Sequence, residues 1–133
     1  MTVADEKLFT PDEANQMLPL VRRIVEDILA IGVKMKAIGA EPDPTPEQVT
    51  DYNKFTDELQ ALFAELGSLG CAYKDWDFTV GLVDWPSVID GERVLLCWRN
   101  DEPAVAYYHS YEDGYAGRRE IPASDLNLAP PAT

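Results

Sequence analysis

The sequence predicts an α+β fold in which an antiparallel two-helix hairpin precedes a small antiparallel sheet of three to four strands. Two long segments within residues 10–69 carry apolar side chains at helical steps of three and four. A Pro-rich turn separates these segments. After Gly70 the character changes, because nine of the 13 aromatic residues lie between Tyr73 and Tyr115, in short runs bounded by turn residues.

The first helix is predicted to begin at Thr10. Thr10 can cap the helix, Pro11 suits the first helical position, and Glu13 completes a capping box. The apolar stripe then continues as far as Gly39. Pro19 lies inside it and has no amide hydrogen, so we expect either a kink there or two helices placed end to end.

The second helix repeats the same start signal at residues 45–48 and ends at Gly67 and Gly70. Its apolar spacing is close to a heptad repeat. Two amphipathic helices joined by a short turn are expected to fold back as a hairpin. Both helices carry a second apolar row, which predicts that the sheet or another subunit covers part of them.

Strands are expected at residues 79–83, 93–99, 103–111 and 118–121. We predict that residues 84–86 break the first strand and that Asp90-Gly91 forms a turn. The whole chain is interpreted as one domain, 1–133, with the hairpin at about 10–69, the β part at about 73–122 and a flexible tail at 123–133.

A loop of two or four residues between the second and third of these strands would pair positions whose numbers sum to about 203. A loop of odd length, or a bulge, would break this register. The predicted register gives six residues to the core face: Val94, Leu96, Trp98, Val105, Tyr107 and His109.

The net charge of −13 excludes two classes of partner. Both halves of the chain carry an acidic excess, so nucleic acid and anionic membranes are poor partners. The N-terminus has no apolar signal core, and no apolar run is long enough to span a bilayer. A cytoplasmic protein is therefore expected, with Cys71 and Cys97 as reduced, packed thiols.

His109 is the single histidine and is the first candidate for chemistry. It could act as a general base or a metal ligand, with Asp84, Glu112 and Asp113 as partners. The alternative is a hydrogen-bonded histidine at the edge of the core. One histidine makes no zinc site of the usual nitrogen- and sulfur-rich kind unless the cysteines join it. No metal and no cofactor is predicted, although an oxygen-rich site stays open.

Arg99 and Arg118 are candidates for binding a carboxylate or phosphate, because the predicted strands bring both to one rim. Internal salt bridges to Glu102, Glu112 or Asp84 are the alternative. The predicted ligand-binding set is Arg99, Arg118, Trp98, Tyr108, Tyr115 and Glu102, with the aromatic residues as walls.

Several stretches look like known sequences. They are Leu8-Phe9-Thr10, Glu13-Ala14-Asn15, Leu18-Pro19-Leu20-Val21, Gly81-Leu82-Val83-Asp84-Trp85-Pro86, Leu95-Leu96-Cys97-Trp98-Arg99, Tyr108-His109 and Gly114-Tyr115-Ala116-Gly117-Arg118. Together they resemble a bacterial domain-of-unknown-function family, number 2203, of uncharacterised conserved proteins. The resemblance implies a helical hairpin plus a small β part and carries no activity. Its polar positions favour a shared site: Asp84, Arg99, Glu102, His109, Asp113 and Arg118.

We expect a non-catalytic protein that self-associates through its hairpin, as a homodimer, and binds a small anionic ligand or peptide group on the β part. The alternative is a small enzyme that uses His109 as base or metal ligand and Arg99 to stabilise developing charge. A third possibility is an assembly adaptor whose helices enter a larger coiled coil.

Overall fold

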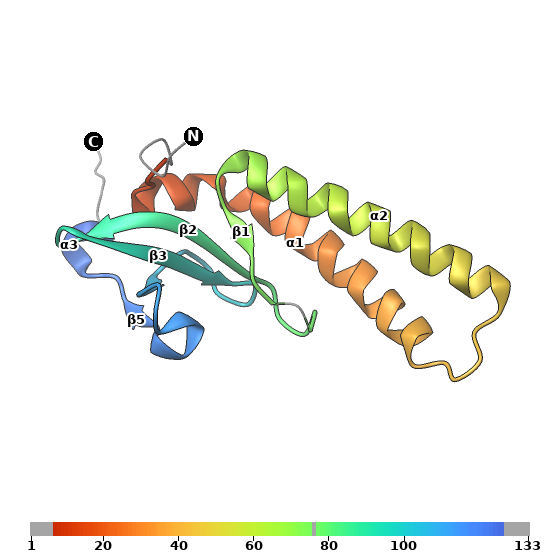
Figure 1. The fold of residues 1–133 in the computed structure, drawn as a ribbon. Coiled ribbons are helices and arrows are strands. Elements are labelled where there is room, and N and C mark those ends of the chain that lie inside the picture. The colour runs from red at the N-terminus through yellow and green to blue at the C-terminus, as the bar shows by residue number, and fades with distance from the viewer. Residues whose placement is uncertain (1–6, 76, 127–133) are drawn as a thin grey trace.

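The computed structural model describes residues 7–75 and 77–126. Helices α1 (Pro11–Gly39) and α2 (Pro46–Leu69) form an antiparallel hairpin, and a sheet lies against one end of it (Figure 1). The sheet is antiparallel and five-stranded, in the order β1-β2-β3-β4-β5. The predicted α+β fold is confirmed, and β1 (Ala72–Tyr73) adds a strand to those expected.

Both helices begin with the capping boxes that the sequence predicts. The Thr10 hydroxyl accepts a hydrogen bond from the Glu13 amide, and the Glu13 carboxylate accepts one from the Thr10 amide. Thr45 and Gln48 repeat this arrangement in α2. Helix α1 runs through Pro19 as one element, so the alternative of two helices end to end is wrong.

Four further strands follow β1, and they differ in extent from the prediction. They are β2 (Leu82–Ile89), β3 (Glu92–Arg99), β4 (Tyr107–His109) and β5 (Arg119–Glu120). The predicted break at residues 84–86 is wrong, because β2 passes straight through them. Pro86 has no amide hydrogen, and it is tolerated because this backbone position faces away from β3. On that side, its carbonyl accepts a hydrogen bond from the Phe9 amide at 2.8 Å.

One face of the sheet packs under α1 and forms the core. The Trp85, Leu96 and Trp98 side chains are fully buried there together with apolar residues of α1 such as Val21 and Val25. The end of the hairpin that holds the turn between α1 and α2 extends beyond the sheet (Figure 1). No helix of the described residues is both long and apolar enough to cross a membrane.

The predicted register between β3 and β4 is wrong by one residue. Leu95 pairs with His109 and Cys97 pairs with Tyr107, so the paired numbers sum to 204. A wide loop, 100–106, replaces the tight turn because its groups bond elsewhere: the Glu102 carbonyl accepts from the Trp98 indole at 2.9 Å. The one-residue shift moves Tyr107 and His109 from the core face to the opposite face.

Two short helices follow β4 in the described part of the chain. The 3-10 helix η2 (Gly114–Gly117) lies between β4 and β5, and α3 (Ala123–Leu126) follows β5. Helix α3 occupies the start of the predicted tail, and the rest of that tail, 127–133, lies outside the described residues.

Candidate functional site

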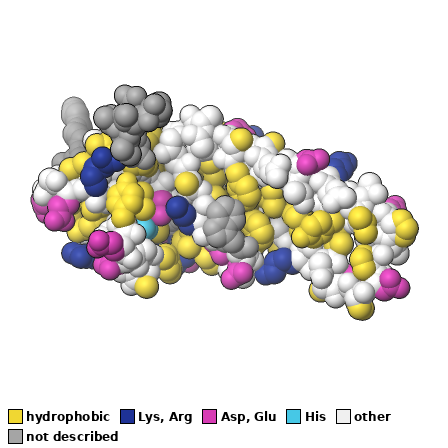
Figure 2. Space-filling model, viewed as in Figure 1, with side chains coloured by type: hydrophobic (Ala, Val, Ile, Leu, Met, Phe, Trp, Pro, Cys, Tyr) yellow, Lys and Arg dark blue, Asp and Glu magenta, His cyan; other side chains and the backbone are white. Residues whose placement is uncertain are grey.

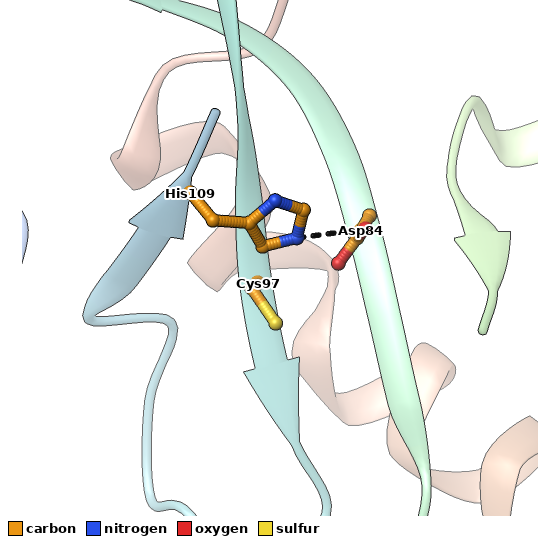
Figure 3. Close-up of side chains that lie close together, drawn as sticks. All are labelled: Asp84, Cys97 and His109. Carbon is orange, nitrogen blue, oxygen red and sulfur yellow. Dashed lines mark hydrogen bonds and ion pairs between the residues drawn. The ribbon is translucent and has the colours of Figure 1, made fainter. Parts of the chain in front are cut away.

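Asp84, Cys97 and His109 meet on the face of the sheet that is turned away from the Trp85 and Leu96 core. They come from three adjacent strands, β2, β3 and β4; His109 and Asp84 point toward each other, and Cys97 lies beside them (Figure 3). One potential ligand atom from each lies within 4.8 Å of the other two, and all three residues are buried. We call this set the metal-ligand cluster.

The His109 ring is held at both nitrogen atoms. Its Nδ1 lies 2.8 Å from the Ser110 carbonyl oxygen, and its Nε2 lies 3.1 Å from Asp84 Oδ2. A carbonyl oxygen only accepts, so Nδ1 carries a hydrogen. The contact between Nε2 and Oδ2 then requires one shared proton, which makes the pair neutral as a whole.

The Asp84 carboxylate is buried, which is unusual for a charged group. Only 4% of the residue is exposed, and its Oδ1 has no hydrogen-bond partner among the described residues. Burial raises the pKa of Asp84, while the charges of His109 and Lys74 and a contact with Cys97 act in the opposite direction. A buried oxygen without a partner is costly, so Oδ1 is the atom of Asp84 that could accept a further donor or bind an ion.

Cys97 is a buried thiol beside this carboxylate. Burial, followed by the Asp84 charge, raises the pKa of Cys97 to about 12, and Arg118 partly opposes the rise. Cys97 therefore keeps its proton at neutral pH. The described residues show no hydrogen bond between Cys97 and His109, so the pair does not form an activated cysteine nucleophile.

The cluster forms the floor of a hollow. This hollow, of about 250 Å³, is also lined by Lys74, Leu82, Leu95, Tyr111, Gly114 and Tyr115. A second hollow of about 570 Å³ shares Lys74, Asp84, Leu95 and Tyr111 with it. The two form one depression around Asp84. Figure 2 shows the histidine, coloured cyan, within a recess beside acidic and basic side chains.

A family model described as "Uncharacterized conserved protein (DUF2203)" matches residues 7–121. The chain belongs to this family. No curated protein and no solved structure matches the chain. The match to DUF2203 includes all three residues of the metal-ligand cluster and confirms the resemblance found in the sequence.

In this DUF2203 protein, Arg99 and Arg118 do meet at one rim, where both contact Glu102. Arg118 Nη2 lies 2.6 Å from Glu102 Oε1 and 3.1 Å from the Cys97 carbonyl oxygen. Arg99 bonds to Asp101 Oδ1 and to the Tyr115 hydroxyl, each at 2.5 Å. The contacts with Glu102 are among the internal salt bridges of the alternative interpretation. Arg118 uses Nη2 for both of its hydrogen bonds, and its buried Nε has no hydrogen-bond partner among the described residues.

The other predicted site residues are divided between the two faces. Tyr115 lines the smaller hollow. Trp98 is fully buried in the core, and Tyr108 packs against that core, so neither lines the hollow. Glu112 and Asp113 are exposed in the turn after β4 and lie outside the cluster.

Sequence reasoning missed Cys97 and Lys74. The wrong register placed Cys97 on the face opposite His109. The signal that identifies it is the strand alternation, which turns Cys97 away from its buried neighbours Leu96 and Trp98. Lys74 has no comparable signal, because its position depends on how β1 adds to the edge of β2.

Proposed function

We propose that this DUF2203 protein binds one divalent transition-metal ion, zinc being the best match, through Asp84, Cys97 and His109. The observation that carries the proposal is the approach of one nitrogen, one sulfur and one oxygen atom to within 4.8 Å of one another. Zinc accepts these three donor types at about 2.0 to 2.3 Å. Binding an ion would require these three atoms to move closer together than they are now.

The surroundings of His109 support the same proposal. A histidine that binds zinc through one nitrogen usually donates its other N–H to a carbonyl or carboxylate. The Nδ1 contact with Ser110 has this form and leaves Nε2 directed toward Asp84 and Cys97.

The charges of the cluster also fit a divalent ion. Without metal, Cys97 keeps its proton and the Asp84–His109 pair shares another, so the cluster is neutral. When an ion replaces these protons, the thiolate and the carboxylate together balance its two positive charges. The buried site is thus neutral in both states and avoids an unpaired buried charge.

Three protein ligands leave a fourth zinc position for water or a substrate, as in catalytic rather than structural zinc sites. Here that position would face the hollow, since all three ligands line its floor. A small enzyme, or a protein that binds its ligand through the ion, is therefore proposed in preference to a purely structural site.

A second candidate function needs no metal. The 3.1 Å contact and shared proton make Asp84 and His109 a buried acid–base pair at the floor of a hollow, which suits general acid–base catalysis. Elemental analysis of the purified protein separates the two candidates. Stoichiometric zinc favours the metal site, and its absence after growth in zinc-supplemented medium favours the acid–base pair.

The decisive experiment compares two cysteine variants. Protein stripped with a chelator is titrated with zinc by calorimetry, using the wild type, Cys97→Ser and Cys71→Ser. Cys71 is an equally buried thiol outside the cluster, so it is the matched control. We expect one zinc per wild-type chain, a loss of more than about tenfold in affinity for Cys97→Ser, and little change for Cys71→Ser. Equal affinity in all three proteins would overturn the proposal.

We also propose that the protein is bacterial and cytoplasmic and that it forms a homodimer through its hairpin. Exposed apolar side chains on the helices support self-association: Leu20, Val33, Val49 and Tyr52. Light scattering tests it, because a clean monomer at micromolar concentration would contradict the dimer.

A further inference from the structure

Lys74 is a basic side chain beside the metal-ligand cluster. It follows β1, where its amide donates to the Leu82 carbonyl at 2.8 Å and so fixes its backbone against β2. It lines both hollows, and in the smaller one it does so together with all three cluster residues.

No ion pair of the described residues neutralises the charge of Lys74. It has no ion pair in the part of the chain that the structure describes, whereas Lys7, the other lysine of the depression, pairs with Glu13. A divalent ion would use the negative charges of Asp84 and Cys97. Lys74, an exposed residue that lines the hollow, would then have no free carboxylate of the cluster to balance its charge.

The walls of the depression are apolar and aromatic. Leu82, Leu95, Tyr111 and Tyr115 line the smaller hollow above the cluster. Its volume of about 250 Å³, with the adjoining 570 Å³, suits a small organic molecule rather than a bare ion.

We infer that the depression binds a small organic anion, a carboxylate or a phosphate ester, with one anionic oxygen at the open position of the metal and another at the Lys74 ammonium. The inference rests on the metal site proposed above. It names the class of ligand or substrate that the site would accept, and it assigns anion recognition to Lys74 in place of Arg99 and Arg118.

The test uses cobalt(II) in place of zinc, because the visible absorption of cobalt changes when a new ligand joins its coordination shell. Cobalt-loaded protein is titrated at constant ionic strength with benzoate, with phenyl phosphate and with neutral benzamide. We expect benzoate or phenyl phosphate to change the spectrum with saturation, and benzamide to leave it unchanged. The anion with the lower Kd identifies the preferred class.

Two lysine variants complete the test. Lys74→Met is compared with Lys54→Met, since Lys54 is an exposed lysine of α2 outside the hollow. We expect Lys74→Met to raise the Kd of the anion by about tenfold without changing the cobalt stoichiometry, and Lys54→Met to have little effect.

Three outcomes would count against the inference. A normal cobalt spectrum that no anion changes overturns it and leaves the metal site standing. Equal anion affinity in Lys74→Met and the wild type also overturns it. A complete absence of cobalt absorption overturns the metal site and this inference together.

Discussion

The side chain of Asn15 hydrogen-bonds both backbone polar groups of Val105. Asn15 Oδ1 accepts from the Val105 amide at 2.7 Å, and Asn15 Nδ2 donates to the Val105 carbonyl at 3.1 Å. The Asn15 side chain, on helix α1, thus forms the two backbone hydrogen bonds that a neighbouring strand would otherwise form with Val105. Because Val105 is held on α1, the loop between β3 and β4 is wide, and β4 pairs in the register that brings His109 to Asp84.

Replacing Asn15 with Asp should destabilise the protein. The acid keeps an acceptor for the Val105 amide but sets an oxygen against the Val105 carbonyl, where the amide had a donor. We expect the free energy of unfolding to fall by about 1 to 3 kcal/mol in urea denaturation at neutral pH. Asn53→Asp, at an exposed position of α2, is the control and should change it by less than about 0.5 kcal/mol. Equal stability of the two variants would contradict this role of Asn15.

The Asn15 contact also explains which parts of the structure could be predicted from the sequence. The helix starts at Thr10 and Thr45 and the turn at Asp90-Gly91 depend on neighbouring residues, and they are confirmed. The register of β4 depends on a partner 90 residues away, which no local pattern reveals. The shift by one residue then hid the cluster, because it separated Cys97 from His109.

The candidate site was predictable to the same limited extent. Asp84 and His109 stand out by residue type, and the structure brings them into contact. Arg99 and Arg118 stand out as well, but each forms an ion pair with a nearby acid, as the acidic composition favours. Lys74 is one ordinary lysine among several, and only the three-dimensional arrangement distinguishes it.

Removing the Glu102 carboxylate should cost more stability than removing its neighbour Asp101. Glu102 and Arg118 form an ion pair whose side chains are only 10% and 11% exposed, whereas Asp101 is 63% exposed beside Arg99. Glu102→Ala leaves a mostly buried guanidinium without its carboxylate, so we expect a loss of about 3 kcal/mol. Asp101→Ala should cost no more than about 1 kcal/mol. Urea denaturation measures both, and similar losses would show that the Arg118 pair has no special role.

Adding a methyl group at Gly81 should lower the stability of the fold, whereas adding one at Gly67 should raise it. A Cβ on Gly81 would overlap Val25 Cγ1, where the start of β2 meets α1. Gly67 lies inside α2, and a Cβ there would meet nothing within 4 Å. We therefore expect Gly81→Ala to destabilise by about 1 to 3 kcal/mol and Gly67→Ala to stabilise by about 0.5 to 1 kcal/mol. Thermal unfolding followed by circular dichroism measures both, and a stabilising Gly81→Ala would contradict the close approach.

The stability of the metal-free protein should fall as the pH rises above about 8.5, the usual pKa of an exposed thiol. Burial raises the pKa of Cys71 to about 12. Above pH 8.5 the unfolded chain therefore loses this proton while the folded chain keeps it, and the ionised thiol favours unfolding. The contribution is fully present below about pH 8.5 and is lost as the pH rises toward the folded-state pKa.

We expect Cys71 to account for a loss of about 1 to 2 kcal/mol between pH 8 and pH 10, because each pH unit in this window is worth up to about 1.4 kcal/mol. The measurement is urea denaturation across this range, with a chelator present, for the wild type and Cys71→Ala. The variant is less stable at pH 8, because it loses buried volume, but its stability should decline less steeply. Parallel pH profiles for the two proteins would mean that the Cys71 thiol ionises as readily in the folded chain as in the unfolded one.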